Sequence, residues 1–89
     1  MKQAKIKIIN KLGLHARAAA KFVTLATEYP CNVSLKHDSK EVNGKSIMGV
    51  MMLAASKGTE LTLTTDGDNE QEALDKLTAL VNNRFDEAS

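Results

Sequence analysis

The hydrophobic pattern of this chain changes period repeatedly within 89 residues, and this alternation most restricts its fold. Segments in which every second residue is apolar indicate half-buried strands, whereas apolar residues that recur every three or four positions indicate amphipathic helices. Strands are predicted at 4–8, 32–36, 40–43 and 61–65, and helices at 16–28, 47–55 and from 70 onward. The chain is long enough for one small domain, 1–89.

The order strand–helix–strand–strand–helix–strand–helix (βαββαβα) predicts an α/β fold of the α+β kind. We expect an open-faced two-layer sandwich, in which three helices cover one face of a four-stranded, mostly antiparallel sheet. Periodicity does not give the strand order. The pattern alone therefore leaves open a ferredoxin-like fold with an extra helix.

Local signals predict where the helices begin and end. Pro30 ends the first helix, because the residue before a proline is pushed out of the helical region. Ser46 is a good N-cap for the second helix, and Gly58 is expected to stop it. Asn69 and Glu72 have the spacing of a capping box at the start of the last helix.

Composition excludes several classes of protein. Hydrophobic residues make up 43% of the chain but aromatic residues only 3%, so the predicted core is aliphatic. No segment approaches the roughly 20 apolar residues that span a bilayer, and the first residues lack the apolar stretch of a signal peptide. The single Cys31 cannot form an internal disulfide, which favours a reducing, cytoplasmic location.

Charge is divided unevenly along the chain. Residues 1–57 carry ten Lys and Arg against three Asp and Glu, whereas residues 58–89 carry two against eight. One interpretation is a solvated surface whose acidic residues are concentrated around the last helix. The other is a basic face, including His15, that attracts acidic protein partners.

A histidine stands at the predicted start of the first helix, in the segment Gly13-Leu14-His15-Ala16-Arg17. The N-terminus of a helix carries unpaired N–H groups and about half a positive charge, so it favours an anion. Arg17 adds a planar, permanently charged donor group. An imidazole in this setting could accept a phosphoryl group and have the product stabilised.

Two segments together resemble a known family. Residues 13–17 and the run Gly44-Lys45-Ser46-Ile47-Met48-Gly49-Val50-Met51, at this separation and in a chain of this length and element order, are similar to HPr. HPr proteins are the histidine phosphocarriers of the phosphoenolpyruvate-dependent sugar phosphotransferase system. The resemblance extends essentially from end to end of the chain.

The resemblance implies a mechanism. His15 would accept a phosphoryl group on Nδ1 from phosphorylated Enzyme I and pass it to the IIA component of a sugar transporter. Arg17 and the backbone amides of Ala16 and Arg17 would stabilise the phosphate. No cofactor is implied in the carrier, because magnesium and phosphoenolpyruvate belong to Enzyme I, and the protein is a relay component rather than a stand-alone enzyme. The family usually has proline where this chain has Ala18, so we expect a slightly looser first turn and retained activity.

Ser46 has two possible roles. As an N-cap, it would stabilise the second helix by about 1 kcal/mol. The resemblance also implies regulatory phosphorylation of Ser46 by an ATP-dependent HPr kinase/phosphorylase. A phosphate at a helix N-terminus is tolerated by the fold, so its effect would fall on partner binding.

The second helix is too short to bury every side, so some of its apolar residues are predicted to face solvent. Flexible methionine side chains suit a surface that binds several partners in turn. The expected docking surface combines residues of the first two helices: Ala16, Ala20 and Thr24 with Ile47, Met48 and Met51.

Other functions have weaker support. His15, His37 and Cys31 do not have the spacing of metal ligands, so no metal site is expected. An RNA-binding module would need aromatic residues on its strands, and here the aromatic residues are predicted elsewhere. The nitrogen-related paralogue of HPr uses the same histidine chemistry in a regulatory relay and stays an alternative. We expect a monomer with no nucleic-acid partner and no membrane insertion.

Overall fold

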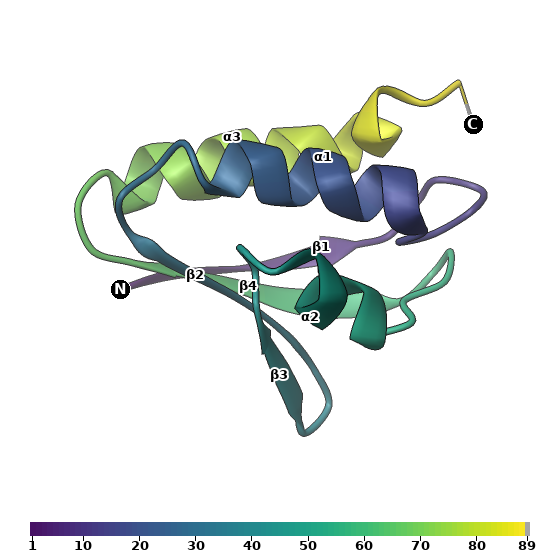
Figure 1. Ribbon diagram of the computed structural model, residues 1–89, viewed down its shortest axis with the longest axis horizontal. Coiled ribbons are helices and arrows are strands. Elements are labelled where there is room, and N and C mark those ends of the chain that lie inside the picture. The colour runs from purple at the N-terminus through teal and green to yellow at the C-terminus, as the bar shows by residue number, and fades with distance from the viewer. Residues whose placement is uncertain (89) are drawn as a thin grey trace.

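Four strands form one antiparallel sheet in the computed structural model, which describes residues 1–88 (Figure 1). They are β1 (Lys2–Lys7), β2 (Asn32–His37), β3 (Lys40–Asn43) and β4 (Glu60–Asp66), in the spatial order β1-β4-β2-β3. All three pairings are antiparallel. The order puts β4 and β2 in the middle, whereas a ferredoxin-like sheet has its first and third strands there, so that alternative is excluded.

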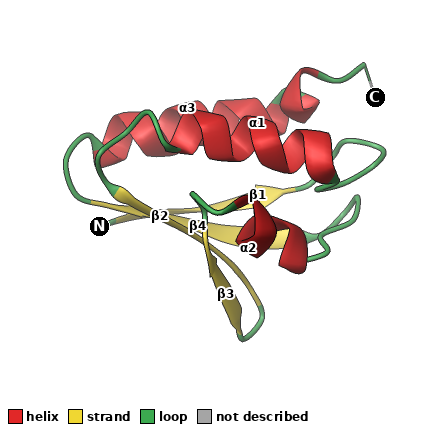
Figure 2. Ribbon diagram, in the orientation of Figure 1, coloured by secondary structure: helices red, strands yellow, loops and turns green. Residues whose placement is uncertain are grey.

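Three helices and one short 3₁₀ turn complete the described chain (Figure 2). They are α1 (Ala16–Ala26), α2 (Ile47–Met52), α3 (Glu70–Asn82) and the 3₁₀ segment η1 (Arg84–Asp86). α1 and α3 lie side by side over one face of the sheet, and α2 packs against α1 and β3 (Figure 1). The predicted βαββαβα sandwich is confirmed.

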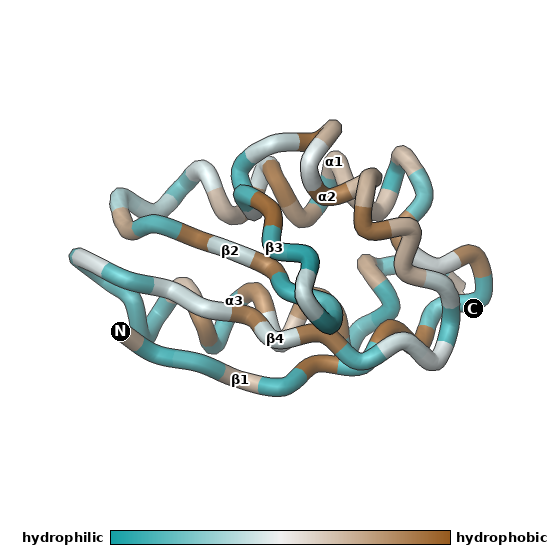
Figure 3. The backbone as a smooth tube through the Cα atoms, turned by 90° about the horizontal axis from the view of Figure 1, so that it is seen from below, coloured by the Kyte–Doolittle hydropathy of each residue, from teal (hydrophilic) through white to brown (hydrophobic). Residues whose placement is uncertain are grey.

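The core lies between the sheet and the helices because the strands alternate. Along β4, Leu61, Leu63 and Thr65 are buried while the intervening residues are more exposed. Figure 3, seen from the sheet side, shows the same alternation of hydropathy along β2 and β4. Ala73 and Leu77 of α3 are fully buried against this layer. Hydrophobic burial on one face of each element therefore holds the two layers together.

The helix boundaries differ from the predictions at their C-terminal ends. α1 ends at Ala26 instead of residue 28, and α2 ends at Met52 instead of residue 55. Gly58 does not end α2, because Ala54 already has a left-handed φ of 50°. The Ser46 cap is confirmed, since its Oγ accepts a hydrogen bond from the Gly49 amide at 3.1 Å.

The predicted capping box of α3 is wrong. Asn69 has a left-handed φ of 64° and its side chain makes no capping hydrogen bond. Instead Glu70 accepts a hydrogen bond from the Gly67 amide at 3.0 Å and pairs with the N-terminal ammonium group. The hydrogen bond from Gly67, with the nearby ammonium group, lowers the pKa of Glu70. The carboxylate that stabilises the start of this helix is thus one residue inside it.

The loop before α1 is held against the loop that follows α2. The Leu14 amide donates to the Ala55 carbonyl at 2.9 Å, and Gly13 has a φ of 70°. A Cβ added to Gly13 would lie 2.6 Å from that carbonyl oxygen, closer than atoms can approach without a shift. Glycine is therefore required two residues before the histidine, for its conformation and for the close approach.

We expect Gly13→Ala to reduce the free energy of unfolding by more than the 1–3 kcal/mol of a left-handed residue alone. Gly58→Ala is the matched control, since Gly58 also has a positive φ but an added Cβ would meet nothing within 4 Å. Urea denaturation of both variants measures the difference. Equal losses would show that the contact with the Ala55 carbonyl does not constrain this loop.

Candidate functional site

His15 occupies the N-cap position of α1, with extended backbone (φ −75°, ψ 177°). Its side chain makes no capping hydrogen bond, and the Ala19 amide is the donor that bonds to the His15 carbonyl, at 2.8 Å. The amides of Ala16 and Arg17 precede that bond and so belong to the group that a helix leaves without intrahelical partners. The predicted pairing of an imidazole with a helix N-terminus is therefore present.

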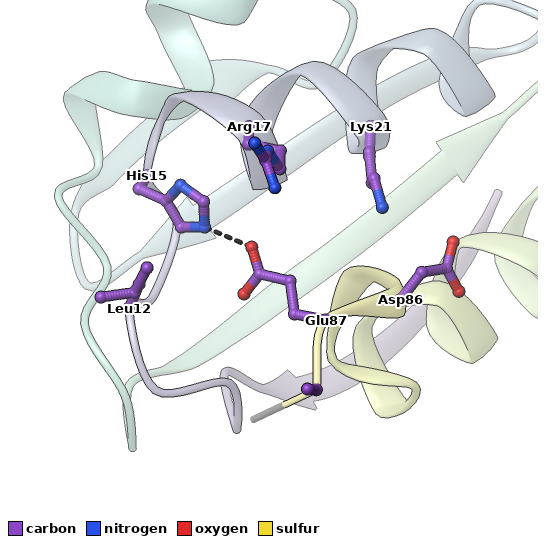
Figure 4. A pocket seen from close by; sticks show the side chains of 7 residues that line it. Leu12, His15, Arg17, Lys21, Asp86 and Glu87 are labelled. Atoms are coloured by element: carbon purple, nitrogen blue, oxygen red, sulfur yellow. Dashed lines mark hydrogen bonds and ion pairs between the residues drawn. The ribbon is translucent and has the colours of Figure 1, made fainter.

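A carboxylate that the sequence analysis did not assign faces the imidazole. His15 Nε2 forms a hydrogen bond with Glu87 Oε2, as the dashed line in Figure 4 shows. The Glu87 side chain is only 14% exposed and that of His15 is 27% exposed. Nδ1 has no hydrogen-bond partner within residues 1–88. One edge of the ring is thus occupied, and the other is available.

Glu87 reaches this position because the chain turns back after α3. Arg84, Phe85 and Asp86 all have left-handed φ values, between 54° and 64°. Phe85 is fully buried within this turn, and its carbonyl accepts a hydrogen bond from Lys21 Nζ at 3.0 Å. Phe85 therefore lies in a 3₁₀ turn and not in a regular helix. It anchors residues 84–88, called the tail below, beside α1.

Asn10 connects the tail to the loop before the histidine. Its Nδ2 donates to the Gly13 carbonyl at 2.8 Å and to Glu87 Oε1 at 2.9 Å. The residue is fully buried, and its Oδ1 is a buried atom without a partner in the described chain. A single amide group thus holds both the loop and the carboxylate.

The hollow beside His15 carries charges of both signs. Arg17 and Lys21 reach it from α1, and Asp86 and Glu87 reach it from the tail (Figure 4). Two residues of the acidic part of the sequence therefore lie next to the histidine. The interpretation that His15 belongs to a basic face is therefore wrong for this hollow, where both signs of charge are present.

Burial of Glu87 by itself would raise its pKa, but other effects outweigh it. Hydrogen bonds from Asn10 and His15, with the charges of His15 and Lys21, lower the pKa of this carboxyl group overall. Glu87 is consequently ionised at neutral pH, and an ionised carboxylate only accepts hydrogen bonds.

Ser46 and the predicted docking residues lie on α1 and α2 or at the start of α2. Ser46 is half-buried at the start of α2, and α2 packs against α1. Ile47, Met48 and Met51 are all more than 40% exposed, with Met48 at 75%. The α1 residues of the predicted surface are exposed or half-buried: Ala16, Ala20 and Thr24.

Sequence reasoning missed several residues near the site. Glu87 and Asn10 are 77 positions apart, and no motif spacing connects them. Two further apolar side chains are exposed, Leu12 at 68%, beside the hollow of His15, and Met52 at 59%, in α2. The excess of acidic residues in 58–89 was visible in the sequence, but the contact of Glu87 with His15 depends on the left-handed turn, which periodicity does not reveal.

Other kinds of site find no support in the described chain. Residues 1–88 contain no group of three or more His, Cys, Asp or Glu side chains able to hold a metal ion. No helix in the same range has the length and apolar character needed to cross a membrane. All three aromatic residues, Phe22, Tyr29 and Phe85, are buried, so none offers a surface for stacking bases.

Comparison with known proteins identifies the family. Residues 2–83, which include His15, match the family model described as PTS HPr component phosphorylation site. The phosphocarrier protein HPr of Pseudomonas aeruginosa is 61% identical over 88 residues, covering 98% of each chain. The chain belongs to the HPr family. Membership confirms the resemblance inferred from residues 13–17 and 44–51.

Solved structures agree with this assignment. The structure of HPr-C-His from Thermoanaerobacter tengcongensis has a TM-score of 0.96 and 44% identity over all of both chains. Bacillus subtilis Crh, 51% identical with 94% of this chain and 97% of that one covered, has a TM-score of 0.77 and is described as a domain-swapped dimer. Because some HPr relatives are dimers, the expected monomer stays a prediction.

Glu87 should make stability depend on pH in one direction. The pKa of Glu87 is lower in the folded protein than in the unfolded chain, so the ionised carboxylate stabilises the fold. This stabilisation is fully present above the ordinary carboxyl pKa, about 4.3, and is lost as the pH falls through the lower folded-state pKa. We expect wild type to be more stable than Glu87→Gln at pH 7, with the difference shrinking below about pH 4.5. Urea unfolding across this range measures it, and a difference that grows in acid would contradict the pKa shift.

Proposed function

We propose that this protein carries a phosphoryl group on His15 between phosphorylated Enzyme I and the IIA components of sugar transporters. The observation that carries the proposal is the ring geometry: Nε2 is hydrogen-bonded, whereas Nδ1 has no partner among residues 1–88, and the residue stands at the N-terminus of α1. Membership of the HPr family supports the same role.

The transfer requires few protein groups. The Nδ1 lone pair attacks phosphorus, the Nδ1–P bond forms, and the bond from phosphorus to the donor group of Enzyme I breaks. The Arg17 guanidinium and the amides of Ala16 and Arg17 then face the negative phosphate oxygens, where donors at a helix N-terminus are favourable. A phosphoramidate is labile, so the group can be passed on to the next protein.

Ala18 in place of the usual proline leaves this arrangement intact. Ala18 is fully buried in the first turn of α1, and alanine is the best helix former. We therefore propose that the carrier activity is retained with Ala18.

Intact mass after incubation with phosphoenolpyruvate, magnesium and Enzyme I tests the proposal. We expect one acid-labile phosphoryl adduct on wild type and none on His15→Ala. Arg17→Ala should slow formation of the adduct by roughly 10²-fold, the usual effect of removing one charge-stabilising donor.

The Enzyme I used must be shown to phosphorylate another carrier. Failure with a sugar-branch Enzyme I, together with an adduct formed by a nitrogen-type Enzyme I, would assign the chain to the nitrogen relay. Failure with both would overturn the proposal.

We further propose that Ser46 is a regulatory site of the same protein, modified by an HPr kinase/phosphorylase. Its Oγ caps α2, and the exposed side chains of Ile47 and Met48 follow directly. A phosphate there would stay compatible with the helix N-terminus while placing about two negative charges beside the apolar docking surface. Binding of Enzyme I through Ile47, Met48 and Met51, with Ala16, Ala20 and Thr24, would then weaken.

Two variants separate charge from capping at Ser46. Asp and Asn are both good N-caps, so Ser46→Asp and Ser46→Asn should each retain the stability of wild type within about 1 kcal/mol. Only Ser46→Asp is expected to raise the KM for Enzyme I in the phosphorylation of His15. Equal KM values for the two variants would contradict control by charge.

The proposed working form is a cytoplasmic monomer. A carrier that binds its partners in turn must release each one, and an exposed surface of adaptable methionines suits successive, transient binding. Sedimentation at working concentration tests the monomer.

A further inference from the structure

We propose that Glu87, held in place by Asn10, is a positioning residue that binds the Nε2 edge of His15 and directs Nδ1 toward the incoming phosphoryl group. This inference rests on the proposed carrier function. It assigns a role in the reaction to a residue that lies beyond the segment matched by the family model, residues 2–83.

The first step concerns the tautomer of the ring. A neutral imidazole has one N–H donor and one acceptor nitrogen, and the partner of one nitrogen determines the state of the other. Glu87 is ionised at neutral pH, so its oxygen can only accept, and Nε2 must be the donor. The lone pair is consequently on Nδ1, the atom that would attack phosphorus.

The second step concerns the orientation of the ring. A histidine side chain that is 27% exposed could otherwise rotate about its side-chain bonds. Glu87 can restrain it because both carboxylate oxygens are engaged: Oε2 binds His15, and Oε1 accepts from Asn10 at 2.9 Å. The His15 ring is thus restrained by the Glu87 carboxylate, which is in turn fixed by Asn10.

The third step concerns Asn10, whose burial is unfavourable for the stability of the fold. Its Oδ1 is buried without a partner in the described chain, which is destabilising by itself. Rotating the amide would place Oδ1 against two acceptor oxygens, those of Gly13 and Glu87, so the neighbours determine its orientation. The role that accounts for this residue is the donation of two hydrogen bonds, which join the loop before His15 to Glu87.

The fourth step is the backbone of the tail itself. Three consecutive residues without glycine, Arg84 to Asp86, are left-handed, a conformation that costs free energy at each position. Buried Phe85 and the hydrogen bond from Lys21 to its carbonyl hold this turn in place. Such strain persists only where the surrounding contacts impose it, and here the turn delivers Glu87 to the histidine.

The arrangement also favours the transition state over the ground state. When Nδ1 bonds to phosphorus, the ring gains positive charge while Nε2 keeps its proton. The hydrogen bond to the Glu87 carboxylate, in which only the acceptor was charged, then has opposite charges on both sides and becomes stronger. An interaction that strengthens during the reaction lowers the barrier, and the ring separates the carboxylate from the phosphate.

The test compares Glu87→Gln with Asp86→Asn in the full chain. Both changes remove one carboxylate from the same hollow. Asp86 accepts a hydrogen bond from Asn83 at 2.7 Å, whereas the carboxylate that contacts His15 in residues 1–88 is that of Glu87. With phosphorylated Enzyme I as donor, Glu87→Gln should lower the kcat of adduct formation about tenfold or more with little change in KM. Asp86→Asn should stay within about twofold of wild type.

Nitrogen NMR of labelled histidine at about pH 8.5, where an ordinary imidazole is neutral, reports the tautomer directly. Wild type and Asp86→Asn should hold His15 in the Nε2–H form, and Glu87→Gln should show a mixture, because a glutamine amide can either donate or accept. An unchanged tautomer ratio or an unchanged kcat in Glu87→Gln would overturn the inference. Because the spectra need no Enzyme I, a wild type that is not phosphorylated would count against the carrier function alone.

Asn10→Ala tests whether Asn10 holds the Glu87 carboxylate in place. A thermal melt first shows that the variant folds. A smaller shift in the same two readouts is expected, since Glu87 would keep its contact with the ring but lose one anchor. A variant that folds and matches wild type in both would remove Asn10 from the inference.

Discussion

The one-sided burial of the antiparallel sheet is the constraint on which the rest of the structure depends. Each strand directs its apolar residues to the same face, and that face is stable only when helices cover it. α1 and α3 cover it side by side, which places the start of α1 close to the turn that follows α3. The histidine and its carboxylate partner meet as a consequence of this packing.

The site is a surface feature built on rigid supports. The hydrogen bond from the Leu14 amide to the Ala55 carbonyl holds the loop before α1, and buried Phe85 holds the segment after α3. Asn10 joins the two. One edge of the imidazole is therefore restrained while the other faces an anion-binding helix N-terminus. Such a layout suits the proposed role of accepting a phosphoryl group and releasing it again, because a phosphate on Nδ1 would not be enclosed.

The element order and the position of His15 could be predicted because they depend on local patterns. Alternation identified the strands, helical spacing identified α1 and α3, and the Ser46 cap followed from the residue type. The predicted ends of α1 and α2 were both too late, and for α2 the reason is that Ala54 adopts a left-handed conformation that its side chain does not favour. The capping box failed because Glu70 took the role expected of Asn69 and Glu72.

By itself, the sequence determined the two-layer α+β fold, a core made mostly of aliphatic residues, the histidine at the start of a helix and the resemblance to HPr. These properties arise from residues close together in the chain, where periodicity and capping act. Only the tertiary structure decided the strand order, the mixed charge beside His15 and the link from Asn10 to Glu87. These contacts join residues far apart in the chain, and those of Glu87 with Asn10 and His15 span more than 70 positions, so they exist only once the sheet and helices have packed together.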